Sequence, residues 1–343
     1  VYSLRALLIS ERPDLIMSFL FHANIVTAWA RSAVPEIPWI ANVRVADPRR
    51  WRAMVERRAL AKAARVACVS REVADACRRR LRVDPRRLTV IPNGVDWQEI
   101  DRQSRDAAEA EAALPRVESA AISAGGVPLA AAFPVAIVGR LETQKGIDRL
   151  FEAWARCASK LAGVRLAIVG EGSERNALQE TAQRLGIENV PHWFGWQSRP
   201  WELLAETQVV LVPSRFEGMA NAMLEAMAAG KVVLATDVAG VREVLEPTGN
   251  DDPFPALPDG TAWQIVRGDR LEPMLERLSQ VLSDKELSAK CQAWNRRRIE
   301  QAFGWPIVVA RYRALIEELV LSLIHISEPT RLRRISYAVF CLK

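Results

Sequence analysis

The 343-residue sequence predicts an α/β protein of two Rossmann-like domains, of which the N-terminal one is incomplete. Strand-like apolar runs alternate with helix-like segments in both halves of the chain, which is typical of doubly wound parallel sheets. An alanine-rich stretch with Gly-Gly and scattered prolines separates the halves. The chain opens inside a helix-like segment rather than with a strand and a glycine turn, so we expect about 60 further residues upstream.

The first half carries the elements of the N-terminal domain, which we expect over residues 1–103. Each predicted strand is a short apolar run bounded by turn-forming residues, and helix-like segments separate the runs. The predicted strands are PDLIMSFL (13–20), VPEIPWIANVR (34–44), ARVACVS (64–70) and LTVIPNGVD (88–96), and the predicted helices include 51–65 and 71–81.

The second half repeats the alternation, with a linker expected at 104–133 and a second domain over 134–303. Its predicted strands end in glycine, serine or aspartate, which mark the loops where an α/β domain binds ligands. The predicted strands are PVAIVGR (134–140), VRLAIVGEG (164–172), VPHWFGW (190–196), QVVLVPS (208–214) and KVVLATD (231–237), and the predicted helices include 174–186, 221–230 and 241–247.

The segment after the second domain predicts an amphipathic helix over 304–320. One helical face collects Val308, Tyr312, Leu315 and Leu319. We expect this face to pack against another part of the chain.

The last 23 residues, 321–343, are excluded from the fold prediction. Residues 321–331 read LSLIHISEPTR and residues 335–343 read ISYAVFCLK, and both resemble the translation of a sequencing-library adapter. Such segments are set aside in the way that expression tags are.

Composition narrows the class of protein. The 47 basic and 41 acidic residues give a net charge of +6, and setting aside the tail removes four basic residues and one acidic residue, leaving +3. This charge argues against a nucleic-acid partner. The five cysteines show no metal-like spacing, and no apolar run is long enough to span a bilayer, so a reduced cytoplasmic setting is expected.

Two predicted strand ends carry residues suited to a diphosphate. Gly139 and Arg140 follow the first strand of the second domain, and Lys145 lies five residues later, near the next helix start. Arginine can bind phosphate oxygens in a fork, and lysine acts as a point charge. Gly170 and Gly172 follow the next strand, where glycine permits a tight turn or a close approach of the backbone.

The segment SRFEGMANAMLEAMAAGK (214–231) is the most informative one. Gly218 allows the backbone to turn, and the amides of Met219 and Ala220 are expected to point outward at a helix start, where free amides bind anions. Glu217 would then lie beside the anion site, although an acid at a helix start also stabilises the helix dipole. Glu225 lies among apolar helix residues and needs a partner, either a ligand hydroxyl or a protein donor.

As an ordered set, these motifs resemble the family 4 retaining glycosyltransferases, which have the GT-B fold. The motifs are IPNGVD, VGRLETQKG, VGEGSER, FGW, PSRFEGMANAMLEAMAAGK, ATDVAGVREVL and FGWPIVVARYRALIEEL, and the resemblance covers roughly residues 10–320. It implies two Rossmann-like domains, a nucleotide-diphosphate sugar bound by the second, and a final helix that crosses back to the first.

The resemblance also implies a role for each motif residue. Arg140 and Lys145 would neutralise the leaving diphosphate, and Glu217 would bind hydroxyls of the donor hexose. Glu225 would accept hydrogen bonds from the ribose. The remaining donor-side residues are Gly139, Gly170, Gly172, Trp196, Gly218, Met219 and Ala220, of which Trp196 suits a nucleobase contact. No D-x-D motif is present, so catalysis without a metal or another cofactor is expected.

The first half departs from the commonest family pattern. Many relatives carry a histidine after the strand that ends in PWIANV, and this chain has Arg44 there. His22, at an earlier strand end, is a second candidate for the cleft lining. Asn93 and Gly94 are expected at the domain junction.

These features favour a glycosyltransferase that moves a hexose to a glycan or lipid-linked acceptor. The alternatives are another GT-B enzyme, such as a nucleotide-sugar epimerase or an inverting transferase, and a nucleotide-sugar-binding module without transfer activity. A basic run over 47–65 suits an anionic membrane surface, although an exposed charged helix face explains it as well.

Overall fold

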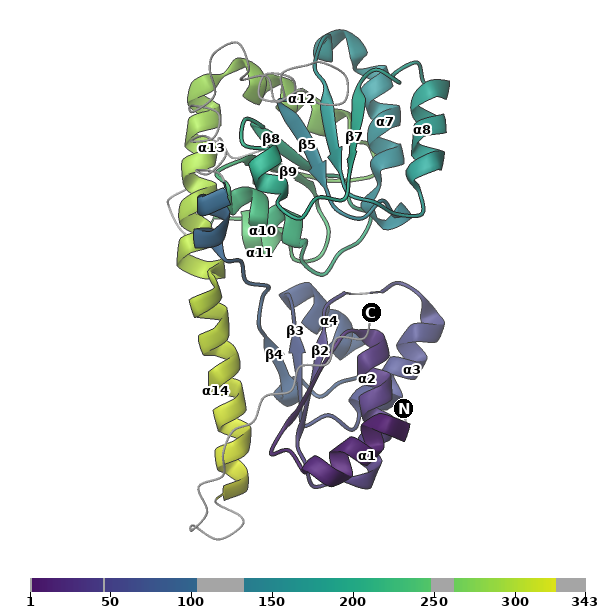
Figure 1. The fold of residues 1–343 in the computed structure, drawn as a ribbon, viewed down its shortest axis with the longest axis vertical. Helices are drawn as coiled ribbons and strands as arrows, with labels where there is room; N and C mark the ends of the chain where they lie inside the picture. The colour runs from purple at the N-terminus through teal and green to yellow at the C-terminus, as the bar shows by residue number, and fades with distance from the viewer. Residues whose placement is uncertain (1, 46, 104–132, 248–261, 325–343) are drawn as a thin grey trace. The chain divides into compact units, whose positions relative to one another are not determined.

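The computed structural model describes residues 2–45, 47–103, 133–247 and 262–324. The contacts divide the chain into two compact units (Figure 1). The first unit comprises 1–93, 217–219 and 305–343, and the second comprises 94–216 and 220–304. This grouping assigns 94–103 to the second unit, whereas the sequence pattern ended the first domain at 103. The predicted linker lies outside the described residues, except for Phe133.

The first unit is built on a parallel sheet with the strand order β1-β2-β3-β4. Every residue of β2 is buried, which explains why its apolar residues do not alternate with polar ones. The strands are β1 (Ile16–Phe19), β2 (Trp39–Val43), β3 (Arg65–Cys68) and β4 (Leu88–Val90), and the helices between and before them are α1 (Tyr2–Glu11), α2 (Phe21–Ala30), α3 (Arg50–Leu60) and α4 (Arg71–Arg79).

Buried polar side chains join the carboxyl ends of β1 and β2. Ser18 Oγ donates to Asn24 Oδ1 at 2.6 Å, and Asn24 Nδ2 donates to the Asn42 carbonyl at 3.1 Å. Asn42 Nδ2 donates to the Ser18 carbonyl at 3.0 Å, and Trp39 Nε1 donates to Ser18 Oγ at 2.8 Å. Since unpaired buried polar groups are costly, this satisfied network fixes the two strand ends against each other.

The long helix α14 (Trp305–Ile324) belongs to the first unit and packs on its sheet. Val308, Leu315 and Leu319 join one buried cluster with residues of β2, β3 and the segment after β4, and Tyr312 packs against the same cluster. The face predicted from the sequence is therefore the face that is buried. The helix includes the first four residues of the segment that was set aside as a tail.

The second unit contains a parallel sheet with the strand order β10-β9-β8-β5-β6-β7, of which Figure 1 labels β5, β7, β8 and β9. The strands that were predicted as apolar runs are mostly buried, as both faces of a doubly wound sheet require, although the edge strand β7 is mostly half-buried. They are β5 (Val135–Val138), β6 (Leu166–Val169), β7 (Pro191–Gly195), β8 (Val209–Val212) and β9 (Val232–Thr236), and β10 (Ile265–Val266) extends the sheet.

Helices cover this second sheet and complete its crossovers. The α/β fold class and the doubly wound character predicted from the sequence are thus confirmed. The helices are α7 (Ile147–Arg156), α8 (Arg175–Arg184), α9 (Pro200–Leu203), α10 (Asn221–Ala228), α11 (Val241–Leu245), α12 (Glu272–Ser283) and α13 (Lys285–Arg298), and the π-helix η5 (Ile299–Phe303) follows.

None of the described helices combines the length and the apolar character that crossing a membrane would require.

Removing buried volume from α14 should destabilise the first unit. Leu315 is only 4% exposed, so Leu315→Ala should lower the free energy of unfolding by about 2–5 kcal/mol, because it leaves a cavity. Val309 lies on the same helix but is 60% exposed, and Val309→Ala should change stability by less than about 0.5 kcal/mol. Chemical denaturation measures both, and equal effects would contradict the packing of this face.

Candidate functional site

The strand order of the second unit places a topological switch point between β5 and β8. The two strands pair in parallel, with Val135 opposite Val209, while the chain winds outward in opposite directions from them. In open α/β sheets, ligands bind beyond the carboxyl ends of the strands at such a point. The loops after β5 and β8 carry the predicted residues Arg140, Lys145 and Glu217.

The loop after β5 places a lysine directly against a glycine. Gly139 has a φ of 150°, which favours glycine, and its amide donates to the Val169 carbonyl at 2.9 Å. A Cβ at Gly139 would lie 3.5 Å from Lys145 Cε. The half-buried Lys145 ends the short 3₁₀ helix η3 (Thr143–Lys145), whereas Arg140 is exposed and forms no ion pair with any described residue.

The glycines after β6 allow two strand-end loops to pack on each other. A Cβ at Gly170 would lie 1.9 Å from the Gly139 carbonyl oxygen, and one at Gly172 would lie 2.2 Å from the Leu141 carbonyl oxygen. Gly170 also has a φ of 143°. The structure therefore gives both glycines a packing role, and their contact with a donor stays a prediction.

The loop after β8 leads into α10 through buried residues. Glu217 is only 7% exposed, and Met219 and Ala220 are buried as well. Ala220 precedes the first turn of α10 in an extended conformation, and no side chain caps this helix end. Helix α10 thus begins where the sequence predicted it, and the outward direction of the Met219 and Ala220 amides stays a prediction. The contacts count Glu217–Met219 with the first unit.

Glu225 receives its partner from the protein. Burial raises the pKa of Glu225, and the hydrogen bond from the buried Trp201 side chain partly offsets that rise. Of the two partners that the sequence left open, the protein donor is therefore present. A carboxylate accepts more than one hydrogen bond, so a ribose contact remains a prediction.

The aromatic residues Trp193 and Phe194 of β7 are half-buried, whereas Trp196, directly after the strand, is exposed. Trp193 meets Phe151 edge-on with ring centroids 6.3 Å apart, and Phe194 meets Phe133 in the same way at 5.3 Å. Trp196, by contrast, is 72% exposed. Trp196 is therefore the member of this trio that is accessible to a ligand.

In the first unit, the structure brings Arg44 and Asn93 together. The Arg44 guanidinium donates to the Tyr312 hydroxyl at 3.2 Å and also to Asn93 Oδ1. Asn93 Nδ2 in turn donates to the Met219 carbonyl at 3.0 Å. A Cβ at Gly218 would lie 1.8 Å from the Arg44 carbonyl oxygen. The backbone bends at Gly218 as predicted, but without a left-handed φ, so the close approach is what requires a glycine there.

The other two first-half candidates do not join this network. His22 is exposed at the start of α2 and meets Phe21 edge-on, with ring centroids 5.3 Å apart. Gly94 begins the second unit and directly precedes the bridge between Val95 and Gly304. Nothing in these contacts links either residue to Arg44.

The sequence interpretation missed an ion pair at the switch point. Arg215 Nη1 donates to Asp148 Oδ1 at 2.6 Å, and Nη2 donates to Oδ2 at 2.5 Å. Burial alone would raise the pKa of Asp148, but the hydrogen bonds from Arg215 outweigh it and the pKa lies below its usual value. Arg215 stands two residues before Glu217 and Asp148 stands three after Lys145, but their spacing in the sequence does not show that the two side chains meet.

No group of three or more His, Cys, Asp or Glu side chains in the described part of the chain is arranged to hold a metal ion. The expectation of a reaction without a metal or cofactor stays a prediction.

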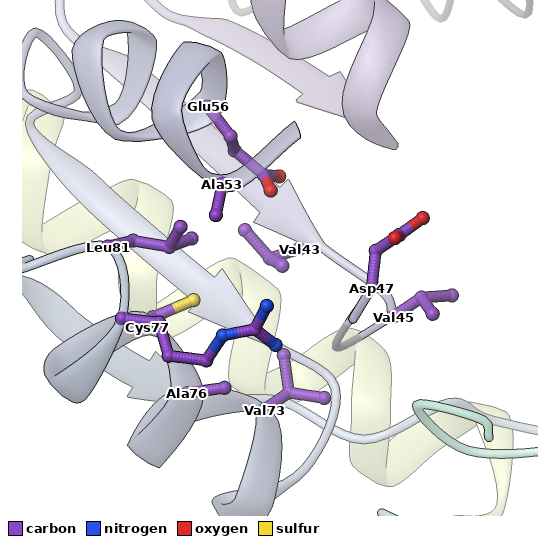
Figure 2. Close-up of a pocket in the computed structure, with 10 residues that line it drawn as sticks. Val43, Val45, Asp47, Ala53, Glu56, Val73, Ala76, Cys77 and Leu81 are labelled. Carbon is purple, nitrogen blue, oxygen red and sulfur yellow. The ribbon is translucent and has the colours of Figure 1, made fainter. Parts of the chain in front are cut away.

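A small hollow lies between α3 and α4 in the first unit. Figure 2 shows Ala53 and Glu56 of α3 across from Val73, Ala76 and Cys77 of α4. Burial raises the pKa of Glu56 to about 7, and the charge of Asp47 adds to the rise, while Arg52 and Arg80 lower it. The hollow is lined by Val43, Val45, Asp47, Ala53, Glu56, Val73, Ala76, Cys77, Arg80 and Leu81.

Two family models match the chain. Glycosyltransferase Family 4 matches residues 1–99, and Glycosyl transferases group 1 matches residues 133–298. The chain belongs to the glycosyltransferases that these two models describe, since together they match most of its length. The family resemblance that the motifs predicted is therefore confirmed.

Curated relatives of this glycosyltransferase match parts of it. The lipopolysaccharide 1,6-galactosyltransferase of Salmonella typhimurium is 35% identical over 122 residues, which are 34% of this chain and 33% of the relative. The D-inositol 3-phosphate glycosyltransferase of Segniliparus rotundus is 34% identical over 167 residues, or 46% of this chain and 33% of the relative. The chain spans about a third of the length of the curated relatives it matches.

Solved structures share the fold at low sequence identity. Anabaena HepE in complex with UDP and glucose has a TM-score of 0.69 at 20% identity, with 89% of this chain and 77% of that chain covered. Sucrose-phosphate synthase from Thermosynechococcus elongatus has a TM-score of 0.70 at 20% identity, with 93% and 76% covered. The likeness agrees with the predicted GT-B fold.

The buried Glu56 should make stability fall as the pH rises from 4.5 to about 7. Its pKa is raised from 4.5 to about 7 by folding, so the folded chain holds a proton that the unfolded chain has lost in this window. The loss reaches at most about 3 kcal/mol. Glu56→Gln should remove this dependence, with a Tm above that of the wild type at pH 8 and a similar Tm at pH 4.

The control is Glu36→Gln, whose carboxylate is 58% exposed. This variant should follow the wild-type Tm at each pH. Parallel pH profiles for the wild type and Glu56→Gln would contradict the raised pKa of Glu56.

Proposed function

We propose that this chain carries out retaining, metal-independent transfer of a hexose from a nucleotide-diphosphate sugar to a hydroxyl group of a glycan or lipid-linked acceptor. The observation that carries the proposal is that two loops lie together at the switch point. The loop after β5 carries the cations Arg140 and Lys145, and the loop after β8 carries the carboxylate of Glu217. The names of the relatives support it, since they include a galactosyltransferase and a lipopolysaccharide core biosynthesis glycosyltransferase from Rhizobium meliloti.

The donor would bind along the carboxyl ends of the second sheet. Arg140 and Lys145 neutralise the diphosphate, and the uncapped start of α10 adds outward amides to the same anion. The buried Glu217 accepts hydrogen bonds from hexose hydroxyls, and Glu225 accepts from the ribose as well as from Trp201. Anabaena HepE has been solved in complex with UDP-glucose, which supports a nucleotide sugar as the donor.

The reaction needs charge stabilisation rather than a covalent nucleophile. The acceptor oxygen forms a bond to the anomeric carbon on the face from which the diphosphate leaves, and the hydroxyl proton passes to a leaving phosphate oxygen. Negative charge grows on that phosphate as the bond breaks. Preorganised cations and amides stabilise this charge, which is how the two loops would accelerate transfer.

The first 93 residues have features that suit binding to an anionic membrane surface. Residues 1–93 contain eighteen Lys or Arg and eight Asp or Glu, an excess of ten positive charges. On α3, Trp51 is 55% exposed and Met54 is 56% exposed, and the exposed Arg50 and Arg57 flank them. We therefore infer peripheral contact with the cytoplasmic face of a membrane, because exposed apolar residues among cations suit anionic headgroups.

Removing either donor-side cation should slow transfer. Arg140→Ala and Lys145→Ala should each lower kcat by about 100- to 1000-fold, because each removes one preorganised group from the developing charge. Lys160→Ala is the control, since Lys160 pairs with Glu276 at 3.0 Å outside the switch point. Turnover is measured with the UDP, GDP or ADP sugar that most raises the Tm of the wild type. Near-normal rates in both loop variants would overturn the assignment.

Vesicle binding tests the membrane contact. The chain should bind vesicles that contain phosphatidylglycerol and release them as salt rises, and neutral phosphatidylcholine vesicles should bind weakly. Trp51→Ala combined with Met54→Ala should weaken binding at least about fivefold, since about 1.5–3 kcal/mol accompanies burial of one large apolar side chain.

Trp305→Ala is the matched control, because Trp305 is also 55% exposed and lies in the same unit. It should leave vesicle binding unchanged. Equal loss in the control, or equal binding to neutral and anionic vesicles, would rule the α3 face out.

A further inference from the structure

The loops after β5 and β8 are joined by more than strand pairing. The Arg215 amide donates to the Gln144 carbonyl at 2.8 Å, and Gln144 Nε2 donates to the Phe216 carbonyl at 2.9 Å. The Arg215 guanidinium reaches back to the Thr143 carbonyl at 2.8 Å while it holds both carboxylate oxygens of Asp148. These bonds connect Thr143, Gln144 and Asp148 to Arg215 and Phe216.

All of these contacts belong to the second unit, and they flank two predicted site residues. Lys145 lies inside the first connected segment, and Glu217 follows Phe216 directly in the chain. The guanidinium of Arg215 is already engaged by a carboxylate and a carbonyl, so it does not need a ligand to satisfy it. Its position is that of a support for the two loops rather than a group that touches the donor.

We propose that Arg215 and Asp148 are positioning residues, which hold Lys145 and the segment leading to Glu217 in the relative geometry that donor transfer requires. The proposal rests on the proposed function. A fork of two parallel hydrogen bonds between arginine and a carboxylate fixes direction as well as distance, so it suits this task. Small misplacements of catalytic groups cost up to about 100-fold in rate.

A contribution to the free energy of unfolding does not by itself explain why Arg215 and Asp148 form a pair. The Arg215 and Asp148 side chains are 30% and 41% exposed, and ion pairs in such settings contribute little to the free energy of unfolding. The same loops keep other contacts, since Arg149 Nη2 donates to the Pro213 carbonyl at 3.0 Å and Gly146 packs against that carbonyl. The fold should therefore survive loss of the pair, while the loops loosen.

The test compares the isosteric Asp148→Asn variant with Asp148→Glu, which keeps the charge. The control is Arg156→Ala, which removes an ion pair with Glu272, at 2.8 Å, from the other end of α7. Hydrogen exchange of the full chain without ligand should show roughly tenfold faster exchange in Asp148→Asn over both 143–146 and 213–216, with a Tm close to that of the wild type. Asp148→Glu and the control should stay near the wild type in both segments.

The second readout is donor use, with the UDP, GDP or ADP sugar that raises the wild-type Tm most. Asp148→Asn should lower kcat/KM by about 10- to 100-fold, and Asp148→Glu should recover most of it. Unchanged exchange in either segment, or equal kcat/KM in Asp148→Asn and the control, would overturn the proposal. If the wild type binds none of the three diphosphates, the proposed function fails and the donor role of the pair fails with it, while the exchange data still report whether the pair links the loops.

Discussion

The parallel pairing of β5 with β8 is the constraint on which the donor side of this molecule depends. Because the two strands run side by side, their carboxyl ends lie at one edge of the sheet, and the loops that leave them begin next to each other. Residues of these loops then pack against one another or form hydrogen bonds at that edge. Lys145 lies along Gly139, Gly170 admits the Gly139 carbonyl, and Arg215 grips Asp148. The contact between Arg215 and Asp148 depends on the pairing of β5 with β8, and the contact between Gly170 and Gly139 depends on the pairing of β5 with β6.

Much of this arrangement could be predicted from the sequence, because it depends on local patterns. The strands β5, β6, β8 and β9 are short apolar runs bounded by glycine, serine or aspartate, and the amphipathic pattern of α14 gave its buried face correctly. Helix ends were less certain, since α3 ends at Leu60 and the pattern extended it to 65. The strand β10 has only two residues, which are too few to show the hydrophobic period that predicts a strand.

The long-range partners could not be predicted, because sequence spacing says nothing of which loops meet. Gly218 was predicted to allow a turn, and only the fold shows that the carbonyl of Arg44, far away in the sequence, also requires a glycine at this position. Glu225 needed a donor, and only the fold shows that Trp201 supplies it. Arg215 and Asp148 are ordinary charged residues until the pairing of β5 with β8 brings their loops together. The residues that a sequence pattern misses are therefore those that position other residues of the site.

The most direct test of the donor site is the amide NMR spectrum of the isotope-labelled chain, titrated with UDP, GDP and ADP. Binding of one of these at the switch point should shift the amides of Gly139, Lys145 and Met219–Ala220 first, with little change at β10 or in α12. Such a pattern would locate the diphosphate beyond the ends of β5 and β8. Saturable shifts centred on other residues, or no shifts with any of the three nucleotides at millimolar concentration, would contradict the account.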